Sequence, residues 1–136
     1  MKGFNLALSK LGDPTCLAAI SELAGVLDRD GPEGAQNILQ GIYERNNFAY
    51  VPTLSGGAIA QTVESGINST IRLSDKFFAA VLGASHRDRE GLDYVETHAS
   101  TILHELVHAL RGNHANDEIS ANWNDRIYDD CFAKRP

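Results

Sequence analysis

Two histidines four residues apart, with a glutamate between them, are the residues of this chain best suited to chemistry. They belong to the segment His104-Glu105-Leu106-Val107-His108, which has the spacing HExxH. On an α-helix, side chains four residues apart lie on one face, so the two imidazoles can bind one metal ion. Glu105 lies about 100° around the helix axis from His104, where its carboxylate can reach a water on that ion without binding the metal. The segment therefore predicts two zinc ligands and a general base.

The sequence around this motif favours the helix that the motif requires. Residues 93–111 contain neither glycine nor proline, and Gly112 follows them directly. Apolar residues recur in this stretch at helical spacing, namely Ala99, Leu103, Leu106 and Leu110. The alternative interpretation is an amphipathic helix with two solvated or hydrogen-bonded histidines, because only three positions of the motif are fixed.

A hydrolytic zinc site needs a third protein ligand and an open position for water. His114 is the candidate that we favour. It follows His108 by six residues, which is the HExxHxxxxxH spacing of the metzincin peptidases that this stretch partly resembles. Arg111 stands where metzincins have a turn glycine, and Met1 is the only methionine of the chain, so their downstream methionine turn has no counterpart here.

Two acidic residues are the alternatives for the third ligand. If the helix ends at Gly112 and another begins near Asn116, the two form a helical hairpin. Such a hairpin returns Glu118 to the level of His108, where a carboxylate could complete the site. Asp117 is the other alternative, because metal-site spacing allows all three residues. Both acids could instead be ordinary first-turn charges at a helix N-terminus.

The composition limits the kinds of protein that this chain can be. Its 136 residues are 43% hydrophobic, which is enough for residues 1–136 to form a single domain with its own core. The net charge of −6, without a basic run, argues against a nucleic-acid or anionic-membrane binder. No apolar run reaches 18 residues, and the apolar part of the N-terminus is too short for a signal peptide. We expect no membrane segment, and a polypeptide substrate suits this composition better.

Along the chain, the rest of the sequence predicts two helices, then a small sheet, and then a further short helix. Asp13 and Pro14 are a cap and a first-turn residue for one helix, and a second helix fits residues 32–45. Short runs rich in β-branched and aromatic residues then predict a mostly antiparallel sheet of strands 48–51, 58–63 and 69–73. Ser74 and Asp75 can begin a short helix that extends to residue 82.

Three further expectations concern what surrounds the motif. Residues 69–73 are the candidate edge strand that an extended substrate could join, with an interior strand as the alternative. On the last helix, one of Asn122, Asp125 and Asp129 could accept the outer N–H of a zinc-bound imidazole. His98 lies about 10 Å along the helix from Glu105, so we expect it in the core or behind the site.

Two cysteines lie near opposite ends of the sequence. Cys16 and Cys131 could form a bridge between the first and last helices, which would imply an oxidising compartment, or they could be two buried thiols. Cys131 continues the apolar stripe of Ile119, Trp123 and Ile127, which favours simple core packing for that residue.

Residues 101–112, followed by Asp117, Glu118 and an asparagine-rich helix, resemble small bacterial HExxH metallopeptidase domains. Such domains form the toxin tips of Rhs-type and related polymorphic secreted proteins. The resemblance extends over residues 71–132 and implies a minimal zincin-like α+β domain. It also implies a toxin or effector, delivered or secreted as part of a larger protein, or else a cytoplasmic enzyme. An immunity or inhibitor protein would be a possible partner.

The motif and the resemblance together predict a zinc metallopeptidase. His104, His108 and His114, or Glu118 or Asp117 in its place, would bind Zn²⁺, and Glu105 would take a proton from the attacking water and give it to the leaving amine. Two other functions fit the same residues: a non-catalytic metal-containing interaction module, and a zinc amidase that acts on cell-wall peptides.

Overall fold

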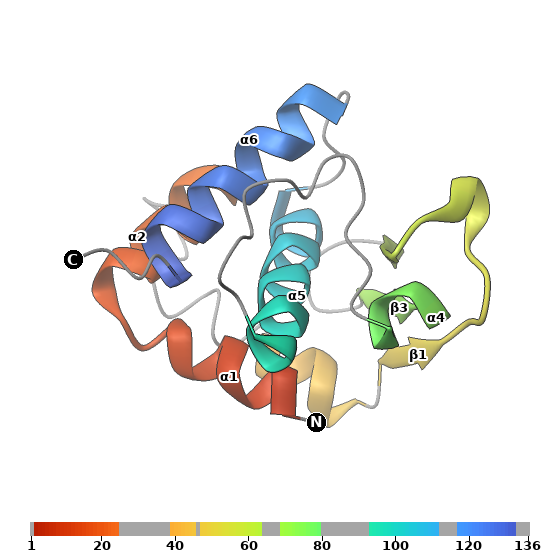
Figure 1. The fold of residues 1–136 in the computed structure, drawn as a ribbon. Helices are drawn as coiled ribbons and strands as arrows, with labels where there is room; N and C mark the ends of the chain where they lie inside the picture. The colour runs from red at the N-terminus through yellow and green to blue at the C-terminus, as the bar shows by residue number, and fades with distance from the viewer. Residues whose placement is uncertain are drawn as a thin grey trace.

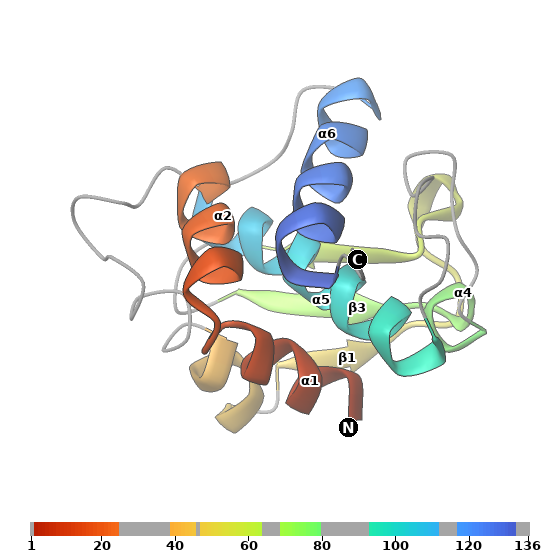
Figure 2. The ribbon, with the colours of Figure 1, turned by 60° about the vertical axis from the view of Figure 1, so that its left-hand side comes forward.

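The protein has an α+β fold in which one long helix lies at the centre. The structure is a computed structural model that describes residues 2–24, 39–45, 47–63, 69–79, 93–111 and 117–132. The central helix lies between a small sheet and a set of other helices (Figures 1 and 2). The helices of the described residues include α1 (Lys2–Lys10), α2 (Pro14–Ala24), α4 (Asp75–Phe78), α5 (Tyr94–Arg111) and α6 (Asp117–Ile127).

The first two helices pack against α5. Helix α2 begins at Pro14 as predicted, and the side chain of Asp13 caps it by accepting a hydrogen bond from the backbone N–H of Thr15. Helix α1 was not predicted, although Phe4, Ala7 and Leu11 have helical spacing and are all buried. Of the helix predicted over residues 32–45, the structure shows residues 39–44 as helical, and residues 32–38 lie outside the described part.

The sheet has three strands, β1 (Phe48–Tyr50), β2 (Ala60–Val63) and β3 (Thr70–Leu73), in the order β1-β3-β2. All three lie within the predicted runs. The prediction of a mostly antiparallel sheet is wrong, because β2 and β3 are antiparallel whereas β1 and β3 are parallel. Since β1 and β2 flank β3 on opposite sides, the chain must cross from one side to the other between them. A short run of apolar residues does not encode that direction.

The edge-strand prediction for residues 69–73 is also wrong. Strand β3 has β1 on one side and β2 on the other, so it is the interior strand of the described sheet. Ile71 and Leu73 point into the core while Arg72 is exposed, which is the alternation expected of a strand with one covered face. Strand β2, at the edge of this sheet, is the one that packs against α5.

A tight turn and a short helix complete the sheet region. Gly56 and Gly57 have φ angles of 67° and 70°, which residues with a side chain rarely adopt, so both positions favour glycine. Ser74 caps α4 as predicted, because its hydroxyl accepts a hydrogen bond from the backbone N–H of Lys76. The helix ends at Phe78 instead of reaching residue 82, and residues 80–82 lie outside the described part.

Helix α5 has the limits that the glycine-free stretch predicts. Asp93 accepts a hydrogen bond from the backbone N–H of Glu96, and the Glu96 carboxylate accepts one from the backbone N–H of Asp93, so the two residues form a reciprocal N-terminal cap. From His98 to Ala109 every residue of α5 is buried, because α1, α2, α6 and β2 all contact it. His104 and His108 are therefore not solvated, and of the alternative interpretation only the form with hydrogen-bonded histidines is left.

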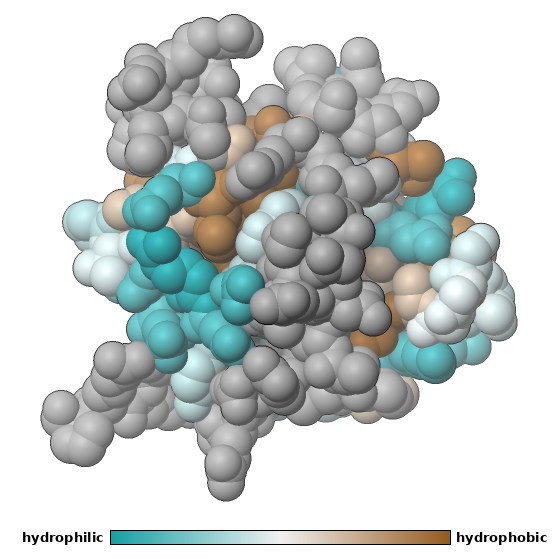
Figure 3. All heavy atoms as spheres, turned by 90° about the horizontal axis from the view of Figure 1, so that it is seen from above, coloured by the Kyte–Doolittle hydropathy of each residue, from teal (hydrophilic) through white to brown (hydrophobic). Residues whose placement is uncertain are grey.

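The surface of the described residues carries both hydrophobic and hydrophilic side chains. Seen from above, hydrophobic residues show as patches between hydrophilic ones (Figure 3). Large hydrophobic side chains that reach the surface include Tyr43, Tyr50, Phe78 and Tyr94. Across the described ranges, the helices are too short or too polar to cross a membrane.

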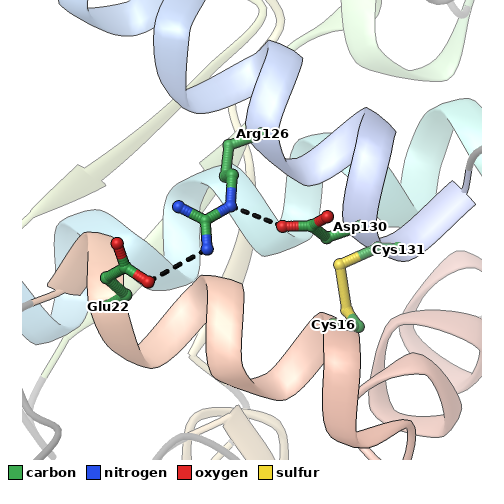
Figure 4. Close-up of polar contacts among 5 residues, drawn as sticks. All are labelled: Cys16, Glu22, Arg126, Asp130 and Cys131. Atoms are coloured by element: carbon green, nitrogen blue, oxygen red, sulfur yellow. Dashed lines mark hydrogen bonds and ion pairs between the residues drawn. A yellow bond between two sulfur atoms is a disulfide. The ribbon is translucent and has the colours of Figure 1, made fainter.

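The C-terminal elements are connected to α2 by a disulfide and by the ion pair between Arg126 and Glu22 (Figure 4). A π-helical turn, η4 (Tyr128–Phe132), follows α6 and carries Cys131, which is bonded to Cys16 of α2. The bridge is thus the correct alternative, and the cysteines are not two separate thiols. Arg126 binds the carboxylates of Glu22 and Asp130, and both hydrogen bonds raise its pKa further above the ordinary value. These contacts fix the position of α6 against α2.

Candidate metal centre

Three side chains of α5 form a compact and buried cluster. The exposed fractions of His104, Glu105 and His108 are 3%, 5% and 8%. One potential ligand atom from each residue can be chosen so that all three lie within 4.8 Å of one another. The helix places the two imidazoles one turn apart, as their spacing predicts, with ring centroids 5.0 Å apart. This buried group could hold a metal ion.

An asparagine from α6 orients the first histidine. Nδ1 of His104 lies 2.9 Å from Oδ1 of Asn124, and the asparagine side chain is 1% exposed. An amide oxygen only accepts hydrogen bonds, so Nδ1 of His104 is the donor here, and in the neutral imidazole Nε2 would carry the lone pair that a metal needs. A hydrogen bond of this kind holds both the tautomer and the ring orientation of a metal ligand.

At His104, the residue that fills this role is not one of the three that the sequence suggested. Asn122 and Asp129 are exposed and Asp125 is only partly buried, whereas Asn124 contacts His104.

The prediction of a helical hairpin was correct in kind, because α6 turns back alongside α5 (Figure 1). The expected register was wrong, because the residue of α6 that forms a hydrogen bond with His104 is Asn124 and not Asn122. One signal was available: Asn124 shares a helix face with Ile127 and Cys131, and a polar residue within an apolar face needs a buried partner.

The single tryptophan of the chain forms an apolar wall beside both histidines. The ring centroid of Trp123 lies 5.4 Å from that of His104 and 5.0 Å from that of His108. The indole is 4% exposed, so it keeps water away from one side of the cluster. Apolar walls lower the local dielectric constant, which strengthens electrostatic interactions inside the site.

Strand β2 supplies a hydrogen bond to the glutamate. The hydroxyl of Thr62 donates to Oε1 of Glu105 over 2.8 Å and also lies 3.0 Å from the backbone oxygen of Glu105. Burial raises the pKa of the Glu105 carboxyl to about 7, and the Thr62 hydrogen bond opposes this by stabilising the charged form. A carboxylate with a pKa near neutrality is suited to take up and release a proton at neutral pH.

The structure places two of the three candidates for a third ligand on a helix. His114 lies outside the described residues. Asp117 is the first residue of α6 and Glu118 is the second, which confirms that a new helix begins where the sequence predicted one. The described part of the chain brings His104, Glu105 and His108 together.

His98 belongs to a different cluster on the same helix. Its ring stacks on Phe77 of α4 with centroids 4.3 Å apart, and it also contacts Tyr94 and Phe78. Its side chain is 8% exposed, and burial lowers its pKa while a hydrogen bond with the Phe77 backbone opposes this. The expectation that His98 lies in the core is confirmed.

No protein-family model, curated protein or solved structure matches this chain.

Proposed function

We propose that this protein is a zinc-dependent peptidase with a zincin-like active site. One observation carries the proposal: two buried imidazoles one helical turn apart, one of them hydrogen-bonded through Nδ1 to Asn124, with a buried carboxylate beside them. Two neutral imidazoles are ligands that zinc prefers, and a glutamate that does not bind the metal is the usual base of such sites. His104 and His108 would hold the ion, with His114, Glu118 or Asp117 as the third ligand.

The chain's own residues account for the proton transfers of amide hydrolysis. Zinc, when bound, lowers the pKa of a coordinated water and polarises the substrate carbonyl. Glu105 takes a proton from the attacking water and passes it to the amine that leaves. Asn124 keeps the ring of His104 in place, and Trp123 excludes water from one side of the site.

The disulfide supports the cellular setting that the sequence resemblance implies. Disulfides persist in oxidising compartments and are rare in the cytosol, so the Cys16–Cys131 bond favours a protein that acts after export. We propose a secreted or delivered effector or toxin domain whose substrate is a polypeptide and whose producing cell needs an immunity or inhibitor protein. These proposals rest on the resemblance and on the disulfide, and each depends on the peptidase activity.

The decisive experiment compares Glu105→Gln with the double variant His104→Ala/His108→Ala. Glutamine keeps the shape of glutamate but cannot take a proton, so hydrolysis of a peptide library should fall by about 10²- to 10⁴-fold while zinc content stays near one equivalent. The double variant should lose both the hydrolysis and the bound zinc. Glu96→Gln is the matched control, because it makes the same chemical change at the far end of α5 and should leave hydrolysis intact.

Each other function predicts a different result. An interaction module would bind zinc yet show no hydrolysis in the parent protein. An amidase would act on cell-wall peptides but not on polypeptides. If Glu105→Gln cleaves as fast as the parent, Glu105 is not the base and the proposed mechanism is wrong.

A further inference from the structure

A single hydroxyl links strand β2 to the catalytic end of the proposed site. Thr62 lies on β2, opposite Ile71 of β3, and its Oγ1 reaches both Oε1 and the backbone oxygen of Glu105. In the part of the chain that the structure describes, Thr62 is the side chain that hydrogen-bonds this carboxylate. The HExxH motif contains no signal for it, because Thr62 lies 43 residues earlier in the sequence.

The position of this hydroxyl depends mainly on the backbone of β2. Threonine is branched at Cβ and has few allowed χ1 angles, so its Oγ1 follows the strand backbone. That backbone is held by the antiparallel pairing of Thr62 with Ile71 and of Gln61 with Arg72. The backbone oxygen of Glu105, 3.0 Å away, shares the single proton of this hydroxyl, so both of its acceptors belong to α5. The sheet thus holds a donor at a set place against the helix.

A fixed donor determines which oxygen of the carboxylate is engaged. Glu105 has three side-chain torsions, so its carboxylate is not oriented by the helix backbone alone. A hydrogen bond to a charged acceptor is shorter and stronger than a neutral one, so the Thr62 contact favours the rotamer that places Oε1 on the strand. The other oxygen, Oε2, then remains to accept a proton.

We propose that Thr62 is a positioning residue for Glu105: its hydroxyl holds Oε1 so that Oε2 faces the reacting water. This inference rests on the proposed peptidase function and assigns the orientation of its base to a residue outside the motif. The opposing interpretation is that Thr62 only fastens β2 to α5, in which case its loss would weaken the fold without a specific effect on turnover.

The experiment compares Thr62→Val, Thr62→Ser and the control Thr70→Val. Valine has nearly the shape of threonine and keeps the strand preference but removes the donor, whereas serine keeps the donor. Thr70 lies on β3 opposite Val63, so its replacement removes a hydroxyl from the same sheet. For each zinc-loaded protein, kcat, KM and zinc content would be measured, and the Glu105 rotamer would be read from crystal structures. Thr62→Ala replaces the valine variant if that protein does not fold.

We expect Thr62→Val to lower kcat by about 10- to 100-fold, with KM and zinc content close to those of the parent. Thr62→Ser should recover most of the loss, and Thr70→Val should resemble the parent. In crystals, the Glu105 carboxylate should leave the parent orientation in Thr62→Val and keep it in Thr62→Ser. A displaced carboxylate together with the fall in kcat would support the proposal.

Two results would overturn the inference. One is an unchanged Glu105 rotamer in Thr62→Val, and the other is an equal loss of kcat in the valine and serine variants. A parent protein that binds zinc but hydrolyses no peptide would refute the proposed function instead. The crystal structures would then still decide whether Thr62 orients the Glu105 carboxylate.

Discussion

The buried carboxyl of Glu105 should make the stability of the metal-free protein depend on pH. Burial raises the pKa of this carboxyl from 4.5 to about 7. Below pH 4.5 the carboxyl is protonated in the folded and unfolded states alike, so it does not affect the equilibrium. Between pH 4.5 and 7 the unfolded chain releases the proton while the folded protein keeps it, so the free energy of unfolding falls as pH rises. Well above pH 7 the carboxyl is ionised in both states, and the free energy of unfolding falls no further on its account.

The size of the loss follows from the two pKa values. Each pH unit between them corresponds to about 1.4 kcal/mol, so the full difference is about 3 kcal/mol. Most of it, about 2 to 3 kcal/mol, falls between pH 5 and pH 8. Glu105→Gln removes the titrating group and should therefore stabilise the metal-free protein at pH 8 relative to the parent, and much less at pH 5.

Urea unfolding of the parent and of Glu105→Gln in the presence of a chelator measures this difference in stability directly. Trp123 is the only tryptophan, is buried and lies beside the two histidines, so its fluorescence reports the unfolding of the region around them. The quantity of interest is the difference in unfolding free energy between parent and variant at each pH, because the other titrating groups contribute equally to both proteins. If that difference stays constant from pH 5 to pH 8, the Glu105 carboxyl is not desolvated in the folded protein and the reasoning is wrong.

Three further predictions test the surroundings of the site. Asn124→Ala should lower zinc affinity by about 10- to 100-fold in competition titrations, whereas Asn122→Ala, on the exposed side of α6, should not. Reducing the Cys16–Cys131 bond, which spans 115 residues, should cost about 5 kcal/mol of unfolding free energy, and the double alanine variant should not respond to reductant. Gly3→Ala should cost about 1 to 3 kcal/mol in urea unfolding, because its Cβ would stand 2.6 Å from a Cβ of α5.

The sequence predicted best those features that depend on local spacing. Helix α5 has nearly the predicted limits, because a stretch without glycine or proline and with one apolar stripe has few alternatives. The HExxH spacing likewise placed His104, Glu105 and His108 together, because four residues make about one helical turn.

Features that depend on packing between distant segments could not be predicted in the same way. The parallel pairing of β1 with β3 is set by how the chain crosses the sheet and not by the strands themselves. Asn124 was missed because the register of α6 on α5 depends on how their side chains interlock, which sequence spacing alone does not determine. Thr62 was missed for a related reason, because the packing of β2 on α5 creates its contact with Glu105.

The position of α6 connects the stability of the fold to the chemistry of the site. This helix contributes Asn124 and Trp123 to the surroundings of His104, and it is held on α2 at its far end by Arg126 and by the disulfide of η4. A metal that binds only the folded arrangement stabilises that arrangement by an amount that grows with the logarithm of its affinity. The contacts that fix α6 should therefore strengthen metal binding although none of them touches the proposed metal ligands. Loss of the disulfide should accordingly weaken zinc binding as well as the fold, whereas a substitution on the exposed face of α6 should affect neither.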